Sequence, residues 1–118
     1  MPLIVIAEDE FLIADVLALM LEDAGYEVAS APHGRAALAL VQDKKPSLVV
    51  TDFMMPLMTG LELAQTMRAN KELVHIPIIL VSGAHGSIGR TYPDVFDAVL
   101  DKPCDEKQLI GTVSRLLR

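Results

Sequence analysis

The chain has 118 residues, of which 52% are hydrophobic and 22% charged, and its formal net charge is −6 at pH 7. This composition excludes a disordered chain, and the first apolar run stops at Glu8, too soon for a signal peptide or for the about 20 apolar residues that span a bilayer. The acidic charge without a basic cluster argues against direct nucleic-acid binding, which depends on Lys and Arg to neutralise phosphates.

The first part of the chain predicts strand, helix, strand and helix in turn. Residues 3–7 are a continuous aliphatic run that stops at Glu8 and Asp9, as a buried parallel strand does. Residues 27–29 predict a weak second strand, and residues 36–41 predict an Ala- and Leu-rich helix after a turn. Between the two strands lies an apolar helical stripe, with Gly25 as the C-terminal cap: Ile13, Val16, Leu17, Met20 and Leu21.

The alternation continues to the C-terminus. The aliphatic run 48–51 stops at Asp52, the run 76–81 stops at Ser82, and a helix is predicted over 61–67 between them. Glycines and a proline crowd the segment after Ser82 and predict a short, irregular fourth helix. The last strand and helix are predicted from the run 96–100, the Asp101-Lys102-Pro103 segment that follows it, and Asp105 as N-cap with Gln108 as its capping-box partner.

Strands that alternate with helices predict an α/β fold, a single doubly wound five-stranded parallel sheet covered by helices on both faces. In the flavodoxin-like strand order 2-1-3-4-5, the first and third strands are neighbours and ligands bind at their C-terminal ends. We therefore expect Glu8, Asp9 and Asp52 to share one pocket. We expect residues 1–118 to form this one domain.

Three carboxylates in one pocket need compensation, because each pair about 4 Å apart repels by roughly 4 kcal/mol at an effective dielectric near 20. Lys102 offsets part of this charge, and Mg²⁺, which prefers carboxylates and water, would offset more. Such a site suits a phosphoryl group, with Asp52 as the nucleophile. Ser82 would donate a hydrogen bond to a phosphoryl oxygen.

The chain resembles the receiver domain of two-component response regulators over essentially its whole length. The residues that carry the resemblance are the Glu8-Asp9 pair, the segment 52–60, the Val81-Ser82 strand end and the Lys102-Pro103 pair. The resemblance implies that Asp52 accepts phosphate from a phosphohistidine of a histidine kinase or phosphotransfer protein. It also implies that Ser82 is the switch hydroxyl, that Lys102 contacts the phosphate, and that the Lys102–Pro103 bond is cis.

The same resemblance implies a metal site and a set of partners. Asp9, Asp52 and the backbone carbonyl of Met54 would bind Mg²⁺, with Glu8 contributing through water. The protein would act on an unidentified downstream protein, with a possible homodimer through the helix 4–strand 5–helix 5 face, and would turn over no external substrate. We expect a cytoplasmic location, which the single cysteine, Cys104, also fits because it excludes an internal disulfide.

Three residues depart from the family pattern. Glu8 replaces the usual first aspartate, and Gly83 replaces the usual alanine after the switch hydroxyl. Val99 occupies the position of the usual Tyr or Phe, so the usual coupling between hydroxyl and aromatic ring cannot operate unless Tyr92 or Phe96 substitutes. We therefore expect the signalling face to relay phosphorylation differently.

Other readings of the same residues remain open. A Mg²⁺-dependent phosphohydrolase would use Asp52, but the usual Asp-x-Asp motif and cap domain are missing. A flavin carrier is disfavoured because the acids at 8–10 would repel an FMN phosphate, and a degenerate interaction module would not need an intact acceptor. The scattered histidines His33, His75 and His85 predict no metal site, and His85, near the pocket, is predicted to be a surface histidine. Cys104 is predicted to be an inert thiol, and Met54, Met55 and Met58 are predicted to serve core and loop packing.

Overall fold

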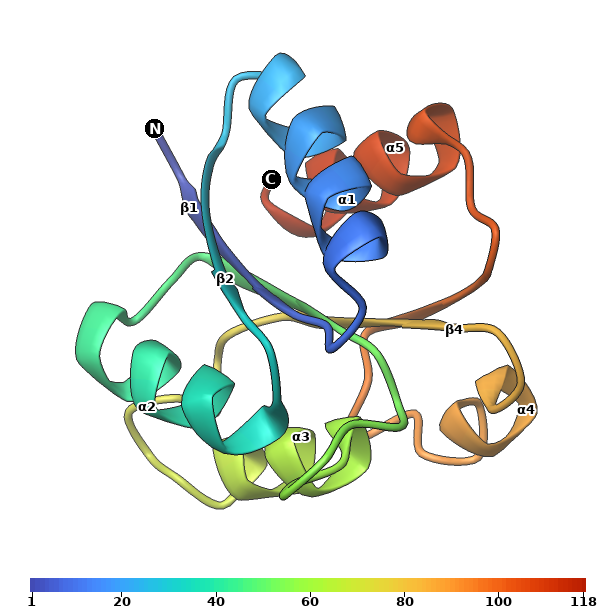
Figure 1. Ribbon diagram of the computed structural model, residues 1–118. Coiled ribbons are helices and arrows are strands. Elements are labelled where there is room, and N and C mark those ends of the chain that lie inside the picture. Colours follow the sequence, from blue (N-terminus) through green and yellow to red (C-terminus); the bar gives the residue numbers. More distant parts are fainter.

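A computed structural model describes residues 1–118 and contains a parallel sheet in the order β2-β1-β3-β4-β5 (Figure 1). The predicted fold class and strand order are confirmed. The strands are β1 (Leu3–Ala7), β2 (Glu27–Ala31), β3 (Leu48–Thr51), β4 (Ile78–Ser82) and β5 (Ala98–Asp101). The helices are α1 (Phe11–Asp23), α2 (Gly34–Lys44), α3 (Gly60–Arg68), α4 (Gly86–Gly89) and α5 (Glu106–Leu116).

The strands differ from the sequence prediction mainly at their ends. β1 and β3 have the predicted bounds, whereas β2 continues to Ala31 because it pairs with β1 along its whole length. β4 begins at Ile78 and not at residue 76, since Pro77 has no N–H to give to the ladder. β5 begins at Ala98, and Phe96 lies before it in a loop, although its side chain is buried in the core.

Side-chain caps set the starts of the helices. α2 begins two residues before the predicted range, because Nδ1 of His33 accepts a hydrogen bond from the Ala36 N–H. α3 begins after Thr59, which forms a reciprocal capping box with Glu62. Asp105 caps α5 as predicted, since its carboxylate accepts the Gln108 N–H, but the Gln108 side chain makes no return hydrogen bond to complete the capping box. α4 has the predicted short length. None of the helices combines the length and the apolar character needed to cross a lipid bilayer.

Helices cover both faces of the sheet and divide the core into two layers. Figure 1 shows α1 and α5 on one face and α2 and α3 on the other, with α4 near the β4 side. Side chains from alternate positions of the central strands feed each layer, as the period of a β-strand requires. The layer under α1 and α5 includes Ile4, Ile6, Leu17, Leu21, Leu109 and Val113. The layer under α2 and α3 includes Val5, Val49, Val41, Leu63, Met67 and Phe96.

The predicted apolar stripe of α1 is only partly buried. Leu17 and Leu21 lie in the core as expected, but Val16 is 49% exposed. Phe11 and Leu12 are 80% and 81% exposed. Because this helix is apolar around most of its circumference, periodicity alone does not determine which side faces the sheet.

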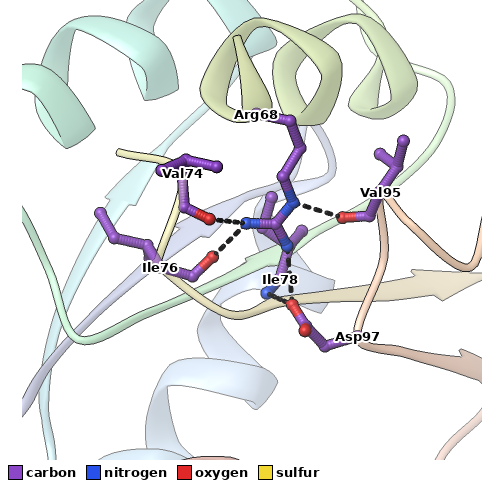
Figure 2. A network of polar contacts seen from close by, with 6 residues as sticks. All are labelled: Arg68, Val74, Ile76, Ile78, Val95 and Asp97. Atoms are coloured by element: carbon purple, nitrogen blue, oxygen red, sulfur yellow. Dashed lines mark hydrogen bonds and ion pairs between the residues drawn. The ribbon is translucent and has the colours of Figure 1, made fainter. Parts of the chain in front are cut away.

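Arg68, the last residue of α3, ties together the strand ends opposite the acidic cluster (Figure 2). Its guanidinium donates to the carbonyls of Val74 and Ile76, each at 2.8 Å, and of Val95 at 3.1 Å. It also pairs with the Asp97 carboxylate at 2.7 Å, and the same carboxylate oxygen accepts the Ile78 N–H. The five donors of Arg allow one side chain to join α3, β4 and the segment before β5.

Candidate functional site

Three carboxylates meet at the C-terminal edge of the sheet, as predicted. Glu8 and Asp9 follow β1, and Asp52 follows β3, which pairs directly with β1. The Asp52 N–H donates to the Ala7 carbonyl at 2.9 Å, so the ladder continues up to the acidic residue. One carboxylate oxygen from each of the three acids lies within 4.8 Å of the others.

The three acids differ in how far they are exposed to solvent. Glu8 is 3% exposed, Asp52 is half-buried and Asp9 is exposed. Burial raises the pKa of Glu8, while hydrogen bonds from Lys102 and from the Glu10 N–H partly oppose this rise. Since the folded pKa lies above the unfolded one, ionisation of Glu8 lowers stability as the pH rises through that raised pKa.

Lys102 is the cation of the site. Its Nζ lies 2.7 Å from Glu8 Oε1 and 3.4 Å from Asp52 Oδ1. Burial alone would lower the pKa of Lys102, but the hydrogen bond to Glu8 and the charge of Asp52 raise it, so the ammonium stays charged. The Lys102–Pro103 bond is cis, as predicted. One lysine faces three carboxylates, and Asp9 makes no ion pair, so an excess of negative charge remains.

The loop after β3 holds Asp52 against the start of α3. The Gly60 N–H donates to the Phe53 carbonyl at 2.8 Å, and a Cβ at Gly60 would lie 2.0 Å from the Asp52 carbonyl oxygen. Only glycine therefore fits this close approach. No backbone N–H donates to the Met54 carbonyl, which leaves this predicted metal ligand without an internal partner. The Met54 side chain is 54% exposed, so the packing predicted for it is wrong, whereas Met55 is buried.

Ser82 lies at the end of β4 and is 1% exposed. Its Oγ accepts the His85 N–H at 3.0 Å. The His85 ring stacks on the Phe53 ring, with centroids 4.9 Å apart and planes 10° from parallel. His85 is half-buried, so the surface position predicted for it is only partly right. A contact between two loop residues far apart in sequence has no periodicity that would reveal it.

The position of the usual switch aromatic is covered by α4. A Cβ at Gly89 would lie 2.3 Å from Leu80 Cδ2 and 3.4 Å from Val99 Cγ2, so the helix backbone packs directly onto β4 and β5. Arg90 then pairs with Asp101 at 2.9 Å. The Val99 side chain therefore lies against Gly89 of α4.

The remaining candidates lie apart from the acidic cluster or are shielded. His33 caps α2 and His75 is exposed, and neither belongs to the acidic cluster. Cys104 is half-buried, and burial raises the pKa of its thiol. A raised pKa reduces the thiolate fraction, which supports the prediction of an inert cysteine.

Known proteins are similar to this chain in sequence and in fold. A family model described as the response regulator receiver domain matches residues 4–114. The chain is 33% identical to the phosphate regulon transcriptional regulatory protein PhoB of Pseudomonas aeruginosa, over 98% of this chain and 51% of that protein. It is 29% identical to the polar-differentiation response regulator DivK of Brucella anthropi, over 97% of this chain and 94% of that protein.

A solved structure of a response regulator has the same fold. The chemotaxis response regulator CheY4 of Vibrio cholerae superposes with a TM-score of 0.90 and 28% identity, over 99% of each chain. The chain spans about half the length of several transcriptional regulators that it matches, among them PhoB.

Proposed function

The chain belongs to the response regulator receiver domain family, and on this premise we propose that Asp52 is a phosphoacceptor. The observation that supports this most directly is the gathering of Glu8, Asp9 and Asp52 beside one half-buried lysine. In the proposed step, a carboxylate oxygen of Asp52 forms a bond to phosphorus as the P–N bond of a phosphohistidine breaks. The imidazole of the donor keeps the electron pair of that bond and takes up a proton.

The residues present also fit a magnesium ion. Asp9 and Asp52 offer carboxylates and Met54 an unpartnered carbonyl, all of them hard oxygen ligands, and Asp9 is exposed and unpaired. Glu8 is engaged by Lys102, which supports a contribution through water and not by direct ligation. When bound, Mg²⁺ would neutralise charge on the transferring phosphoryl group.

Lys102 and Ser82 complete the proposed site. The Lys102 ammonium lies close enough to Asp52 to pair with a phosphoryl oxygen once the acid is modified. The Ser82 hydroxyl would donate to another phosphoryl oxygen. The phosphorylated form would bias the segments around it toward a second arrangement that a downstream protein reads.

This chain has an apolar surface next to the site on which a donor protein could dock. An apolar groove of ≈ 270 Å³ lies between α1 and the residues that follow β5, and Lys102 is among its lining residues. The exposed Phe11 and Leu12 extend this apolar surface. We propose that a histidine kinase or phosphotransfer protein docks here and that the chain turns over no external substrate. A homodimer through the α4–β5–α5 face stays a prediction.

Magnesium is expected to stabilise the protein through the acidic cluster. At a free concentration ten times its dissociation constant, Mg²⁺ adds about 1.4 kcal/mol to the free energy of unfolding and raises the melting temperature by about 5 °C. Asp9→Asn removes one ligand and one repulsion, so it should melt higher than the wild type without Mg²⁺ and gain little from the ion. Thermal melts with Asp43→Asn as the exposed control test this. An equal Mg²⁺ shift in wild type and Asp9→Asn would contradict the ligand assignment.

The phosphoacceptor assignment is tested by labelling with acetyl phosphate, whose acyl phosphate bond replaces that of the donor protein. In Mg²⁺ the wild type and Asp43→Asn should each take up one phosphoryl group per chain, whereas Asp52→Asn takes up none. Chelation of Mg²⁺ should stop the reaction. Absence of any label on the wild type would favour a phosphate-independent interaction module, and continuous release of phosphate at high rate would favour a phosphohydrolase.

A further inference from the structure

A stacked aromatic pair joins the loops that follow β3 and β4 beside the acidic cluster. Phe53 is the residue after Asp52, and its ring packs against the core layer under α2 and α3. The His85 ring lies parallel to it at 4.9 Å, and both residues are half-buried. No group in the proposed phosphorylation chemistry requires this contact, so its role has to be sought in what it holds in place.

The backbone of His85 holds the buried Ser82 hydroxyl. The His85 N–H donates to Ser82 Oγ at 3.0 Å, and this is the only hydrogen bond that the hydroxyl oxygen makes. The Ser82 proton donates to no other group of the protein. Since the oxygen is used as an acceptor of the His85 N–H, the proton remains available to a phosphoryl oxygen.

We propose that the Phe53–His85 stack positions the Ser82 hydroxyl for phosphoryl transfer to Asp52. The core fixes Phe53, the Phe53 ring fixes the His85 ring, and the His85 N–H then fixes the Ser82 oxygen. A donor that is already oriented costs no reorganisation when charge develops on the phosphoryl group. This inference rests on the proposed function, and it assigns Phe53 and His85 as positioning residues that do not touch the reacting atoms.

The test separates the ring of His85 from its backbone N–H. His85→Ala removes the ring and keeps the N–H, whereas His85→Phe keeps an aromatic plane. His85→Ala is expected to lower the rate constant for phosphorylation by acetyl phosphate about tenfold, which corresponds to about 1.4 kcal/mol. His85→Phe should stay within about twofold of the wild type, and the dissociation constant for Mg²⁺ should be unchanged within the same margin in both variants.

A double-mutant cycle with Ser82→Ala shows whether the stack acts through the hydroxyl. In the Ser82→Ala background, His85→Ala should change the rate constant by less than about twofold, because the group that the stack positions is already gone. A further tenfold loss in that background would overturn the proposal. Equal slowing by His85→Phe and His85→Ala would overturn it as well.

Amide hydrogen exchange gives a readout that does not depend on phosphorylation. The His85 amide should exchange faster in Phe53→Ala and in His85→Ala than in the wild type, and His85→Phe should keep it protected. If the His85 amide exchanges at the wild-type rate in both alanine variants, the proposal that the stack positions Ser82 is contradicted. A wild-type protein that takes up no phosphoryl group contradicts the proposed function instead, so the two failures are distinguishable.

Discussion

Lys102→Gln is expected to slow the phosphorylation of Asp52 about a hundredfold, because it removes the cation that faces the transferring phosphoryl group. The lysine Nζ lies 3.4 Å from the Asp52 carboxylate and 2.7 Å from that of Glu8. Its loss leaves a buried carboxylate without its partner, so we also expect a lower free energy of unfolding, by about 2 kcal/mol without Mg²⁺. Rate constants with acetyl phosphate and thermal melts measure the two effects.

Lys102→Gln should also change the affinity for Mg²⁺, which is expected to rise although the phosphorylation rate falls. Without the ammonium, the repulsion between Lys102 and an incoming cation disappears, so Mg²⁺ should bind Lys102→Gln more tightly than the wild type. Lys107→Gln, on the exposed side of α5, is the matched control and should change neither quantity. Weaker Mg²⁺ binding together with a slow reaction would indicate a collapsed site. An unchanged rate would contradict the role of Lys102.

Arg68→Ala is expected to lower the stability strongly, although Arg68 lies outside both the acidic cluster and the apolar core. The side chain makes three hydrogen bonds to carbonyls and one ion pair with Asp97, and its own exposed fraction is 18%. Its removal leaves these partners unsatisfied and should cost about 3 kcal/mol, with a melting temperature about 10 °C lower. Urea and thermal denaturation measure the change.

Two matched variants make this prediction specific. Arg68→Lys keeps the charge and loses the planar fork, so it should fall between wild type and Arg68→Ala. Arg115→Ala on the exposed side of α5 should melt close to the wild type. Because Arg68 lies at the strand ends opposite Asp52, the folded fraction of Arg68→Ala should still be phosphorylated at the normal rate. Equal stability of Arg68→Ala and wild type would contradict the account of this network.

The sequence predicted the sheet and the acidic cluster because both depend on simple patterns. An aliphatic run that stops at an acid marks a buried strand and its C-terminal end, and the strand order brings neighbouring ends together. These patterns therefore predict the gathering of Glu8, Asp9, Asp52 and Lys102 that the structure contains. Strand ends were less certain, since Pro77 limits β4 through hydrogen bonding and not through hydropathy.

Contacts between distant loops could not be predicted in the same way. Arg68 binds mainly backbone carbonyls, which every residue possesses, so no sequence pattern marks its partners. The Phe53–His85 stack joins two irregular segments, and the exposed face of α1 follows from a helix that is apolar on most sides. In each case the tertiary structure selects one contact among several that local preference allows.

Mapping the phosphorylated residue tests the central claim most directly. Borohydride reduces an acyl phosphate to an alcohol, so a phosphorylated aspartate becomes homoserine and can be located by peptide mass spectrometry. After incubation with acetyl phosphate and Mg²⁺, we expect homoserine at position 52 alone. Reduction at residue 8 or 9, or a labelled protein with an unmodified Asp52, would contradict the account.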